Sequence, residues 1–250
     1  MAIFLVALLG VDFSLGASLQ APKKSSIIVM YANLLAIMNF TDFSRKISKI
    51  ENLPLPGVDS HYKMAPLATV LELKTEEIKK RNPRKAGVMA LFYPDNVLNT
   101  HLLLILRKTY QGVHSNQISF PGGKMEQEDM NLLTTALRET HEEVGVKPRD
   151  IKVIKQLSQI YIPPSNFEVF PYLGLYNMNE PFKLQDEEVE TLVEVSLADF
   201  MDEKRIVKEK ITTSYAKEWE VPAFKLNGYT VWGATAMMLS EVKELFKQVL

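Results

Sequence analysis

Phe120–Val146 reads FPGGKMEQEDMNLLTTALRETHEEVGV and carries the strongest structural signal in the chain. Its apolar residues recur at the spacing of one helix face, which predicts a helix over Asn131–Val144. Asp129 is expected to cap the start of this helix and Gly145 to end it, since both residue types are common at those positions. The helix would bury one stripe of side chains: Leu133, Leu137, Thr140 and Val144.

Three glutamates, Glu139, Glu142 and Glu143, lie on the side of this helix opposite the stripe. Like charges at i,i+4 destabilise a helix by about 0.2–0.5 kcal/mol per pair, and the helix dipole disfavours acids near its C-terminus. A divalent cation would relieve this repulsion, and oxygen ligands suit Mg²⁺ or Mn²⁺. The alternative is a solvated acidic face. Pro121-Gly122-Gly123 favours the metal site, because glycine lets the backbone approach a ligand closely.

Outward from this helix, short β-prone runs alternate with turn residues and predict an α/β domain. Pro121-Gly122-Gly123 is expected to stop a strand, and Asn227-Gly228 predicts a hairpin turn. A C-terminal helix is predicted from Met238, Val242, Leu245 and Val249, which share one face. The expected strands are Gly87–Tyr93, Leu102–Arg107, Ile118–Phe120, Ile151–Ile160, Val169–Tyr176, Glu190–Val195, Pro222–Leu226 and Tyr229–Trp232.

The N-terminal part of the chain has a different character. Helices are expected at Phe40–Glu51 and Thr69–Lys80, so residues 38–84 are predicted to form a helical extension of a domain spanning residues 85–250. Met1–Gly10 is apolar but shorter than the roughly 20 residues that span a bilayer. Two interpretations of residues 1–37 stay open: a signal-like segment, or a mis-assigned start that precedes a true start at Met38. A start at Met38 would imply a cytoplasmic protein.

Composition excludes several classes of protein. Apolar residues make up 46% and charged residues 24% of the 250 residues, as in a globular domain, which excludes disordered and fibrous proteins. The net charge of −1 gives no field for capturing nucleic acid or an anionic membrane, so a small-molecule partner is expected. The absence of cysteine excludes disulfides, thiolate metal sites and a thiol nucleophile. Monomer and homodimer both remain open.

The acidic helix and the loop before it resemble the Nudix box, G-x5-E-x7-R-E-U-x-E-E-x-G-U, where U is aliphatic. The matching residues are Gly123, Asp129 and the run Arg138–Val146. Asp129 replaces the box glutamate, one extra residue separates it from Arg138, and Thr140 stands at an aliphatic position. The first two departures are similar to the coenzyme A diphosphatase branch of the Nudix hydrolases.

A second motif of that branch lies upstream. Leu103–Lys108 and Asn116–Gly123 are similar to it through Arg107, Ile118 and Phe-Pro-Gly-Gly, whereas Gly112 and Asn116 depart from it. Two downstream stretches also look like this branch: Pro164-Ser165-Asn166-Phe167 and Trp232-Gly233-Ala234-Thr235. The resemblance covers about residues 85–250.

The resemblance implies a Nudix fold, in which helices sandwich a mixed β-sheet. It also implies metal-dependent hydrolysis of coenzyme A or acyl-CoA to 4′-phosphopantetheine, or its acyl form, and adenosine 3′,5′-bisphosphate. Because Gly112 and Asn116 depart from the motif, ADP-ribose or NADH remains an alternative substrate. A non-catalytic nucleotide-binding module is the alternative from another class, and the self-repelling acids argue against it.

By the same resemblance, Glu139 and Glu143 would be paired metal ligands, together with the carbonyl of Gly123. Glu142 would be a further ligand or a base that orients water. Arg138 would hold the carboxylates in place, and Asp129 would anchor the loop.

Several substrate contacts are expected with an alternative for each. Arg107 would bind a phosphate or form a surface salt bridge, and His114 and Ser119 would contact substrate or close a turn. Phe120 and Gly122 belong to the same motif and are also candidate substrate contacts.

Three further features stay open between a functional and a structural interpretation. Glu188 and Glu190 are candidates for an additional acid, or they form the charged start of a strand. Tyr161 and Phe167 would stack on an adenine, line a groove, or pack in the core. The basic run Lys79–Lys85 would meet the 3′-phosphate of coenzyme A, or it is a solvated linker. His141, on the flank of the helix, is expected to be exposed.

Overall fold

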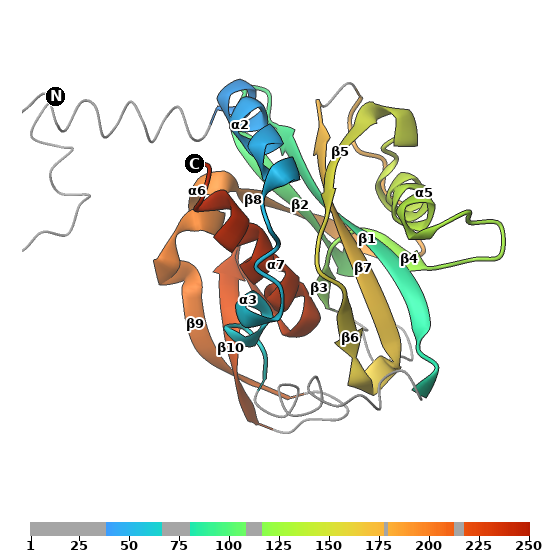
Figure 1. Cartoon of the computed structure of the whole chain (residues 1–250), viewed down its shortest axis with the longest axis vertical. Helices are drawn as coiled ribbons and strands as arrows, with labels where there is room; N and C mark the ends of the chain where they lie inside the picture. The colour runs from blue at the N-terminus through green and yellow to red at the C-terminus, as the bar shows by residue number, and fades with distance from the viewer. Residues whose placement is uncertain (1–38, 67–80, 109–116, 178–179, 213–217) are drawn as a thin grey trace, which may run out of the picture. The chain divides into compact units, whose positions relative to one another are not determined.

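The computed structural model describes residues 39–66, 81–108, 117–177, 180–212 and 218–250 (Figure 1). Eight strands of these segments form one mixed sheet, ordered β3-β2-β1-β7-β5. β1 (Arg84–Pro94) lies at the centre, parallel to β7 (Phe167–Tyr176) and antiparallel to β2 (Thr100–Arg107). The other members of this sheet are β3 (Ile118–Ser119), β4 (Gly122–Lys124), β5 (Ile151–Gln156), β6 (Ile160–Ile162) and β8 (Val189–Ser196).

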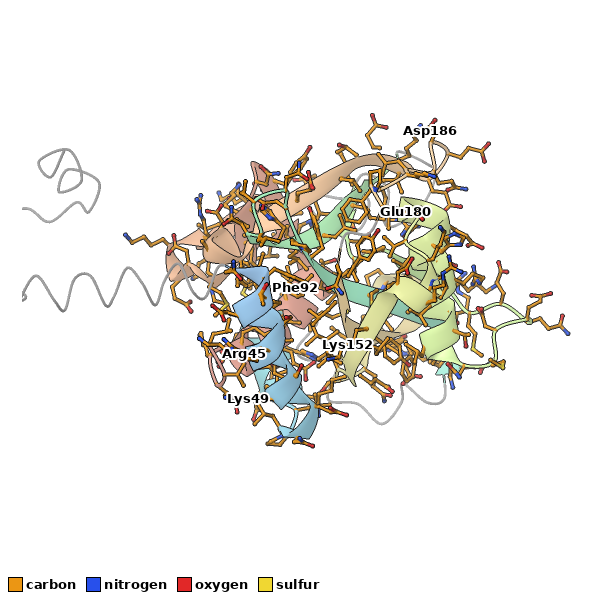
Figure 2. The ribbon with its side chains drawn as sticks, turned by 90° about the horizontal axis from the view of Figure 1, so that it is seen from above. Arg45, Lys49, Phe92, Lys152, Glu180 and Asp186 are labelled. Carbon is orange, nitrogen blue, oxygen red and sulfur yellow. The ribbon has the colours of Figure 1, made fainter. Side chains whose placement is uncertain are left out.

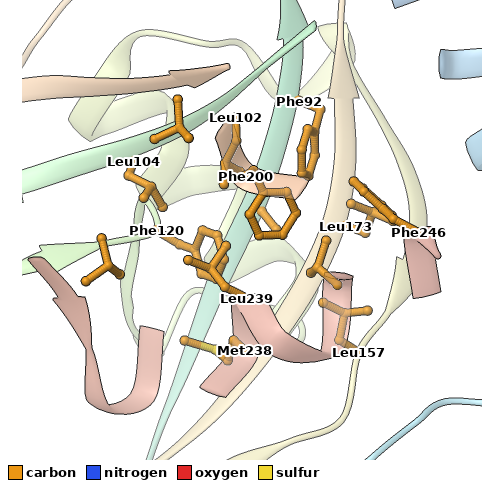
Figure 3. Packing of buried hydrophobic residues seen from close by; sticks show 14 of the residues in the cluster. Phe92, Leu102, Leu104, Phe120, Leu157, Leu173, Phe200, Met238, Leu239 and Phe246 are labelled. Atoms are coloured by element: carbon orange, nitrogen blue, oxygen red, sulfur yellow. The ribbon is translucent and has the colours of Figure 1, made fainter. Parts of the chain in front are cut away.

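The central strand is buried on both faces, because successive side chains of a strand point to opposite sides. Met89, Leu91 and Tyr93 join one hydrophobic cluster, against α5 (Leu132–Val144). Ala90 and Phe92 join the other, against α2 (Phe40–Ile47) and α7 (Gly233–Phe246) (Figures 2 and 3). Helices therefore cover both faces of the sheet, which confirms the predicted α/β sandwich.

A second, three-stranded sheet consists of β9 (Ile206–Ile211), β10 (Trp219–Leu226) and β11 (Tyr229–Trp232). β10 and β11 form the predicted hairpin, in which Asn227 and Gly228 have φ values of 45° and 81°. Positive φ at both turn positions is what a tight two-residue hairpin requires. β9 was not predicted; its exposed and half-buried side chains alternate on an open edge.

The N-terminal helices pack into the same core as the sheet. Asn39 caps α2, and Phe43, Ile47 and Ile50 join the hydrophobic cluster of α7. The helix predicted over Phe40–Glu51 is an α-helix followed by the 3₁₀ turn η2 (Ser48–Asn52); α3 (Val58–Tyr62) comes next. The domain boundary near residue 84 remains a prediction. The expected helix Thr69–Lys80 and residues 1–37 lie outside the described residues.

Helix α5 confirms its predicted end but not its predicted start. Gly145 ends it in the left-handed conformation, with φ of 77°, a conformation that glycine adopts without strain. The N-cap is Asn131, not Asp129, because the Asn131 side chain accepts the backbone N–H of Thr134. The expected stripe is only partly right: Thr140 and Val144 are buried, whereas Leu133 and Leu137 are half-buried.

Strand β3 ends at Ser119, before Pro121-Gly122-Gly123 as expected, but Gly122–Lys124 then forms a further strand that was not predicted, β4, paired with β1 through Gly123 and Gly87. The single strand expected over Ile151–Ile160 is broken into β5 and β6. Between them, the Ser158 backbone N–H donates to the Glu241 side chain instead of to a neighbouring strand. The remaining described elements are η4 (Pro148–Asp150), η5 (Pro163–Ser165), α6 (Leu197–Met201) and η6 (Glu203–Arg205). No described helix combines the length and the hydropathy needed to cross a membrane.

Candidate active site

Three carboxylates converge where α5 faces the β7–β8 loop. One oxygen from each of Glu139, Glu143 and Glu188 lies within 4.8 Å of the others. Two of these acids come from successive turns of α5, and the third directly precedes β8. Such an arrangement supplies oxygen ligands for a divalent cation, and oxygen is the donor that hard cations prefer.

Glu143 is the buried member of this acid cluster. Its side chain is 1% exposed, and its Oε2 accepts the backbone N–H of Gly122 at 2.7 Å. Arg107 Nη1 lies 3.1 Å from Oε1, although Oε1 has no aligned hydrogen-bond donor. Burial raises the pKa of Glu143 to about 7, and the neighbouring charge of Arg107 opposes this only in part. A further positive charge close to Glu143 would favour its ionised form.

Arg138 binds acids on both sides of it. Its Nε and Nη2 donate to Asp129 at 3.0 and 2.9 Å, and its Nη1 donates to Glu139 at 3.0 Å. The same Nη1 donates to Glu142 at 2.9 Å. The Glu142 side chain is 51% exposed and lies outside the acid cluster. Arg138 therefore fixes Glu139 while neutralising part of the charge around it.

Asp129 anchors the loop before α5. Its Oδ2 accepts the backbone N–H of Glu126 at 2.9 Å and the Thr135 hydroxyl at 3.0 Å. The hydrogen bonds from Arg138 lower the pKa of Asp129 to about 2. The predicted anchoring contacts are present, although Asp129 does not cap the helix.

Asp129→Asn is expected to lower the free energy of unfolding at pH 7 by about 2 kcal/mol, the equivalent of its pKa displacement from 3.8 to about 2. This stabilisation is complete above pH 3.8 and is lost as the pH falls towards 2, because the native carboxylate releases its proton more readily than the unfolded one. Urea unfolding at pH 7 and pH 3 measures it. Exposed Glu128→Gln is the control and should change stability by less than about 0.5 kcal/mol. Equal stability of the two variants would contradict the anchor.

Gly123 lies against the Glu139 carboxylate. A Cβ added at this glycine would come within 2.4 Å of Glu139 Cδ and 2.5 Å of both carboxylate oxygens. No other residue type leaves that carboxylate where it is. The predicted proximity of Gly123 to the acids is thus present.

A register shift between β2 and β8 occurs at Leu106/Arg107. Beyond it, the backbone N–H of Lys108 donates to the carbonyl of Glu188 at 2.9 Å. Irregularities of this kind turn side chains of a strand end towards a site. Arg107 thereby reaches Glu143, and its Nη1 also donates to the Gly122 carbonyl at 3.3 Å.

The other candidate residues are distributed as follows. Ser119, Phe120 and Gly122 line one cleft with Arg107, and the buried Ser119 hydroxyl has no hydrogen-bond partner among the described residues. Glu190 is exposed on β8 and lies outside the acid cluster. His141 is exposed as expected. His114, like Gly112 and Asn116, lies outside the described residues.

The cleft has a volume of about 650 Å³ and begins beside the acid cluster, at Gly122 and Gly123. Most of its lining is apolar. Its apolar walls include Val88, Ile160, Ile162, Val169, Trp219, Trp232, Met237 and Met238. The described charged side chains that line it are all cationic: Arg81, Arg107 and Lys124. Its chemistry suits a ligand with an anionic part and an extended apolar part.

A family model described as the NUDIX domain matches residues 83–215. The chain belongs to the Nudix hydrolase family. The Nudix hydrolase NudL of Yersinia pestis (strain Pestoides F) is 32% identical over 148 residues, which are 57% of this chain and 71% of that protein. Nudix hydrolases act on phosphorus-containing anhydrides, and this chain is such a hydrolase.

Two solved structures match parts of this chain. The Nudix hydrolase RenU from M. smegmatis covers 66% of this chain and 88% of its own, at 14% identity and a TM-score of 0.43. A MutT/nudix family protein from Enterococcus faecalis covers 76% of this chain and 73% of its own, at 16% identity and a TM-score of 0.43.

Nudix hydrolases generally use divalent metal ions, and the acid cluster of this Nudix hydrolase fits one. Its donors are all carboxylate oxygens, and three of them lie within 4.8 Å of one another. Within the described part of the chain, the buried Oε1 of Glu143 has no hydrogen-bond donor. A buried acid of raised pKa with an unsatisfied oxygen is a group that a cation would complete.

Sequence patterns did not reveal two other groups of residues. The apolar cleft walls of β6, β10 and α7 come from separate segments without a motif. Glu241 is buried and binds the Gly57 N–H, Ser158 and the His61 ring, which ties the N-terminal helices to α7. The apolar residues one helical turn to either side of Glu241, Met237 and Leu245, were the available hint for this network.

Proposed function

We propose that this Nudix hydrolase cleaves the diphosphate linkage of coenzyme A or acyl-CoA. The products are 4′-phosphopantetheine, or its acyl form, and adenosine 3′,5′-bisphosphate. The single observation that carries the proposal is the largely apolar, cation-bearing cleft that starts at the acid cluster. Coenzyme A joins a polyanionic nucleotide to an uncharged arm that ends in a thiol or, in acyl-CoA, in an apolar acyl group, whereas ADP-ribose and NADH carry a second, polar ribose beyond the diphosphate.

Glu139 and Glu143 would hold the metal ion, Mg²⁺ or Mn²⁺, and the Gly123 carbonyl would be a further contact. A bound ion would neutralise charge on the linked phosphates and acidify a water molecule. In the reaction, water oxygen bonds to one phosphorus, the bond from that phosphorus to the bridging oxygen breaks, and the other phosphate leaves with that oxygen.

The protein's own side chains have distinct tasks in this scheme. Arg138 keeps the Glu139 carboxylate in place, and Arg107 keeps Glu143 oriented from the cleft side. Glu188 is exposed and belongs to the acid cluster. We assign to it the acceptance of the water proton, in preference to Glu142, which is held by Arg138 away from the acid cluster.

Incubating the full chain with Mg²⁺ and either coenzyme A, octanoyl-CoA, ADP-ribose or NADH tests this function. Mass spectrometry is expected to detect adenosine 3′,5′-bisphosphate from the first two substrates, with kcat/KM at least about tenfold above the others, since a buried apolar arm adds binding free energy. A second series with Mn²⁺ and a series with chelator establish the metal requirement. Preferential release of AMP from ADP-ribose or NADH would overturn the substrate assignment.

A further inference from the structure

Arg81, three residues before β1, belongs to a hydrogen-bonded group of side chains on the cleft wall. Arg81 Nη1 donates to the Tyr161 hydroxyl at 3.4 Å, and its guanidinium carbon lies 5.9 Å from the centre of that ring. The Tyr161 hydroxyl donates to Asn166 Oδ1 at 2.9 Å, and Asn166 Nδ2 donates to the Arg81 carbonyl at 3.1 Å. Arg81 is thereby fixed at both its backbone and its side chain.

The backbone of Asn166 connects this group to the start of β1. Asn166 has a positive φ of 50°, and its carbonyl accepts the backbone N–H of Arg84 at 3.0 Å, where β1 begins to pair with β7. Figure 1 shows β6 and the start of β1 at the same end of the sheet. Arg81 and Tyr161 both line the cleft, whereas Arg84 does not. An arginine held this way on a cleft wall is preorganised for a ligand.

The charge of the cleft indicates what that ligand carries. Its described lining contains Arg81, Arg107 and Lys124 and no carboxylate. Arg107 is engaged with Glu143 beside the acid cluster. Arg81 stands apart from that cluster, on the wall shared with Tyr161, Pro163 and Pro164. A guanidinium binds a phosphate monoester with two parallel hydrogen bonds, and the proline side chains that line the cleft with it offer apolar contacts to a base.

We propose that Arg81, positioned by Tyr161 and Asn166, binds a phosphate monoester on the ribose of the nucleotide. On the proposed function, on which this inference rests, that group is the 3′-phosphate. It is the group that distinguishes coenzyme A from dephospho-coenzyme A. Arg81 is thus a specificity-determining residue, outside the reacting atoms.

The test compares two substrates that differ only in this phosphate. Arg81→Ala is expected to raise KM for coenzyme A by about 10- to 100-fold, the loss typical of hydrogen bonds to a charged group. For dephospho-coenzyme A, KM should change by less than about twofold, and kcat should be unaffected for both. Tyr161→Phe should move KM in the same direction by a smaller factor, and Arg81→Lys should restore part of the affinity.

Arg84→Ala is the matched control. It removes the same charge from the same segment, but Arg84 itself does not line the cleft: its guanidinium lies 4.2 Å from the Phe167 ring centre and donates to the Ser165 carbonyl at 2.9 Å. The ratio of the two KM values should therefore stay at its wild-type level. A ratio unchanged in Arg81→Ala, or changed equally in both arginine variants, would overturn the proposal.

Binding to metal-free protein separates this inference from the proposed function. Calorimetric titration of the full chain should show tighter binding of adenosine 3′,5′-bisphosphate than of AMP, and Arg81→Ala should abolish the difference. If the wild type hydrolyses neither substrate but shows this preference, the phosphate site stands and the proposed reaction fails. Equal binding of both nucleotides by the wild type would refute the phosphate site.

Discussion

Glu143→Gln is expected to reduce hydrolysis of the preferred substrate by about a thousandfold while the protein remains folded. Glu143 supplies a buried oxygen without a hydrogen-bond donor in a cluster of three acids. A metal ion held by the acid cluster would lower the barrier by several kcal/mol, and about 4 kcal/mol corresponds to a thousandfold in rate. The loss should appear in kcat at saturating metal, and metal titration should show weaker binding.

The same substitution, Glu143→Gln, should not lower the stability of the metal-free protein. Because burial raises the pKa of Glu143 from 4.5 to about 7, the native carboxyl retains its proton more strongly than the unfolded one. The metal-free wild type should therefore lose stability as the pH rises from about 4.5 to about 7. The amide oxygen that the substitution introduces still accepts the Gly122 N–H, so the variant should lack this decline and be at least as stable as the wild type at pH 8. A lower melting temperature at pH 8 would make Glu143 a structural residue.

Glu142→Gln is the matched control on the same helix. The Glu142 side chain is half-exposed, contacts Arg138 and lies outside the acid cluster, so its loss should cost only about tenfold, through a less restrained Arg138. A loss as large as that of Glu143→Gln would return Glu142 to the reacting centre and argue against Glu188 as the proton acceptor.

The sequence predicted α5 and its acids because both depend on local spacing. Helical periodicity places Glu139 and Glu143 on one arc whatever the rest of the chain does. It does not tell which acid is buried, since that depends on β4 and Arg107 packing over Glu143. It also could not choose between Asp129 and Asn131 as the cap, because both residue types cap helices well.

The third acid illustrates what local patterns cannot supply. Glu188 and Glu190 have similar sequence surroundings, and both were candidates. The pairing of β8 with β2, and the register shift at Arg107, bring Glu188 to the acid cluster and leave Glu190 outside it. A one-residue change of register reverses which face a strand side chain occupies. The cleft walls likewise come from segments that meet only through the sheet.

Gly123→Ala is expected to lower kcat about a hundredfold with little change in stability. Gly123 is outside the positive-φ positions, so its backbone accepts alanine without strain. The new Cβ, however, would come within 2.4 Å of the Glu139 carboxylate, which is the movable end of a flexible side chain. The carboxylate would swing away at little energetic cost, but a displacement of about 1 Å in a reacting site costs about a hundredfold in rate.

Gly228→Ala is the control, because it should lower stability without lowering kcat. Gly228 has φ of 81° at the β10–β11 turn, with no atom within 4 Å of an added Cβ. This variant should lose about 1 kcal/mol of stability, because alanine is strained at positive φ, and should keep full kcat. Thermal melts and initial rates of both variants therefore separate the effect of displacing the Glu139 carboxylate from the effect of lowering the stability of the fold. Full activity in Gly123→Ala would mean that the Glu139 carboxylate is not required where it lies, since the added methyl group leaves it no room there.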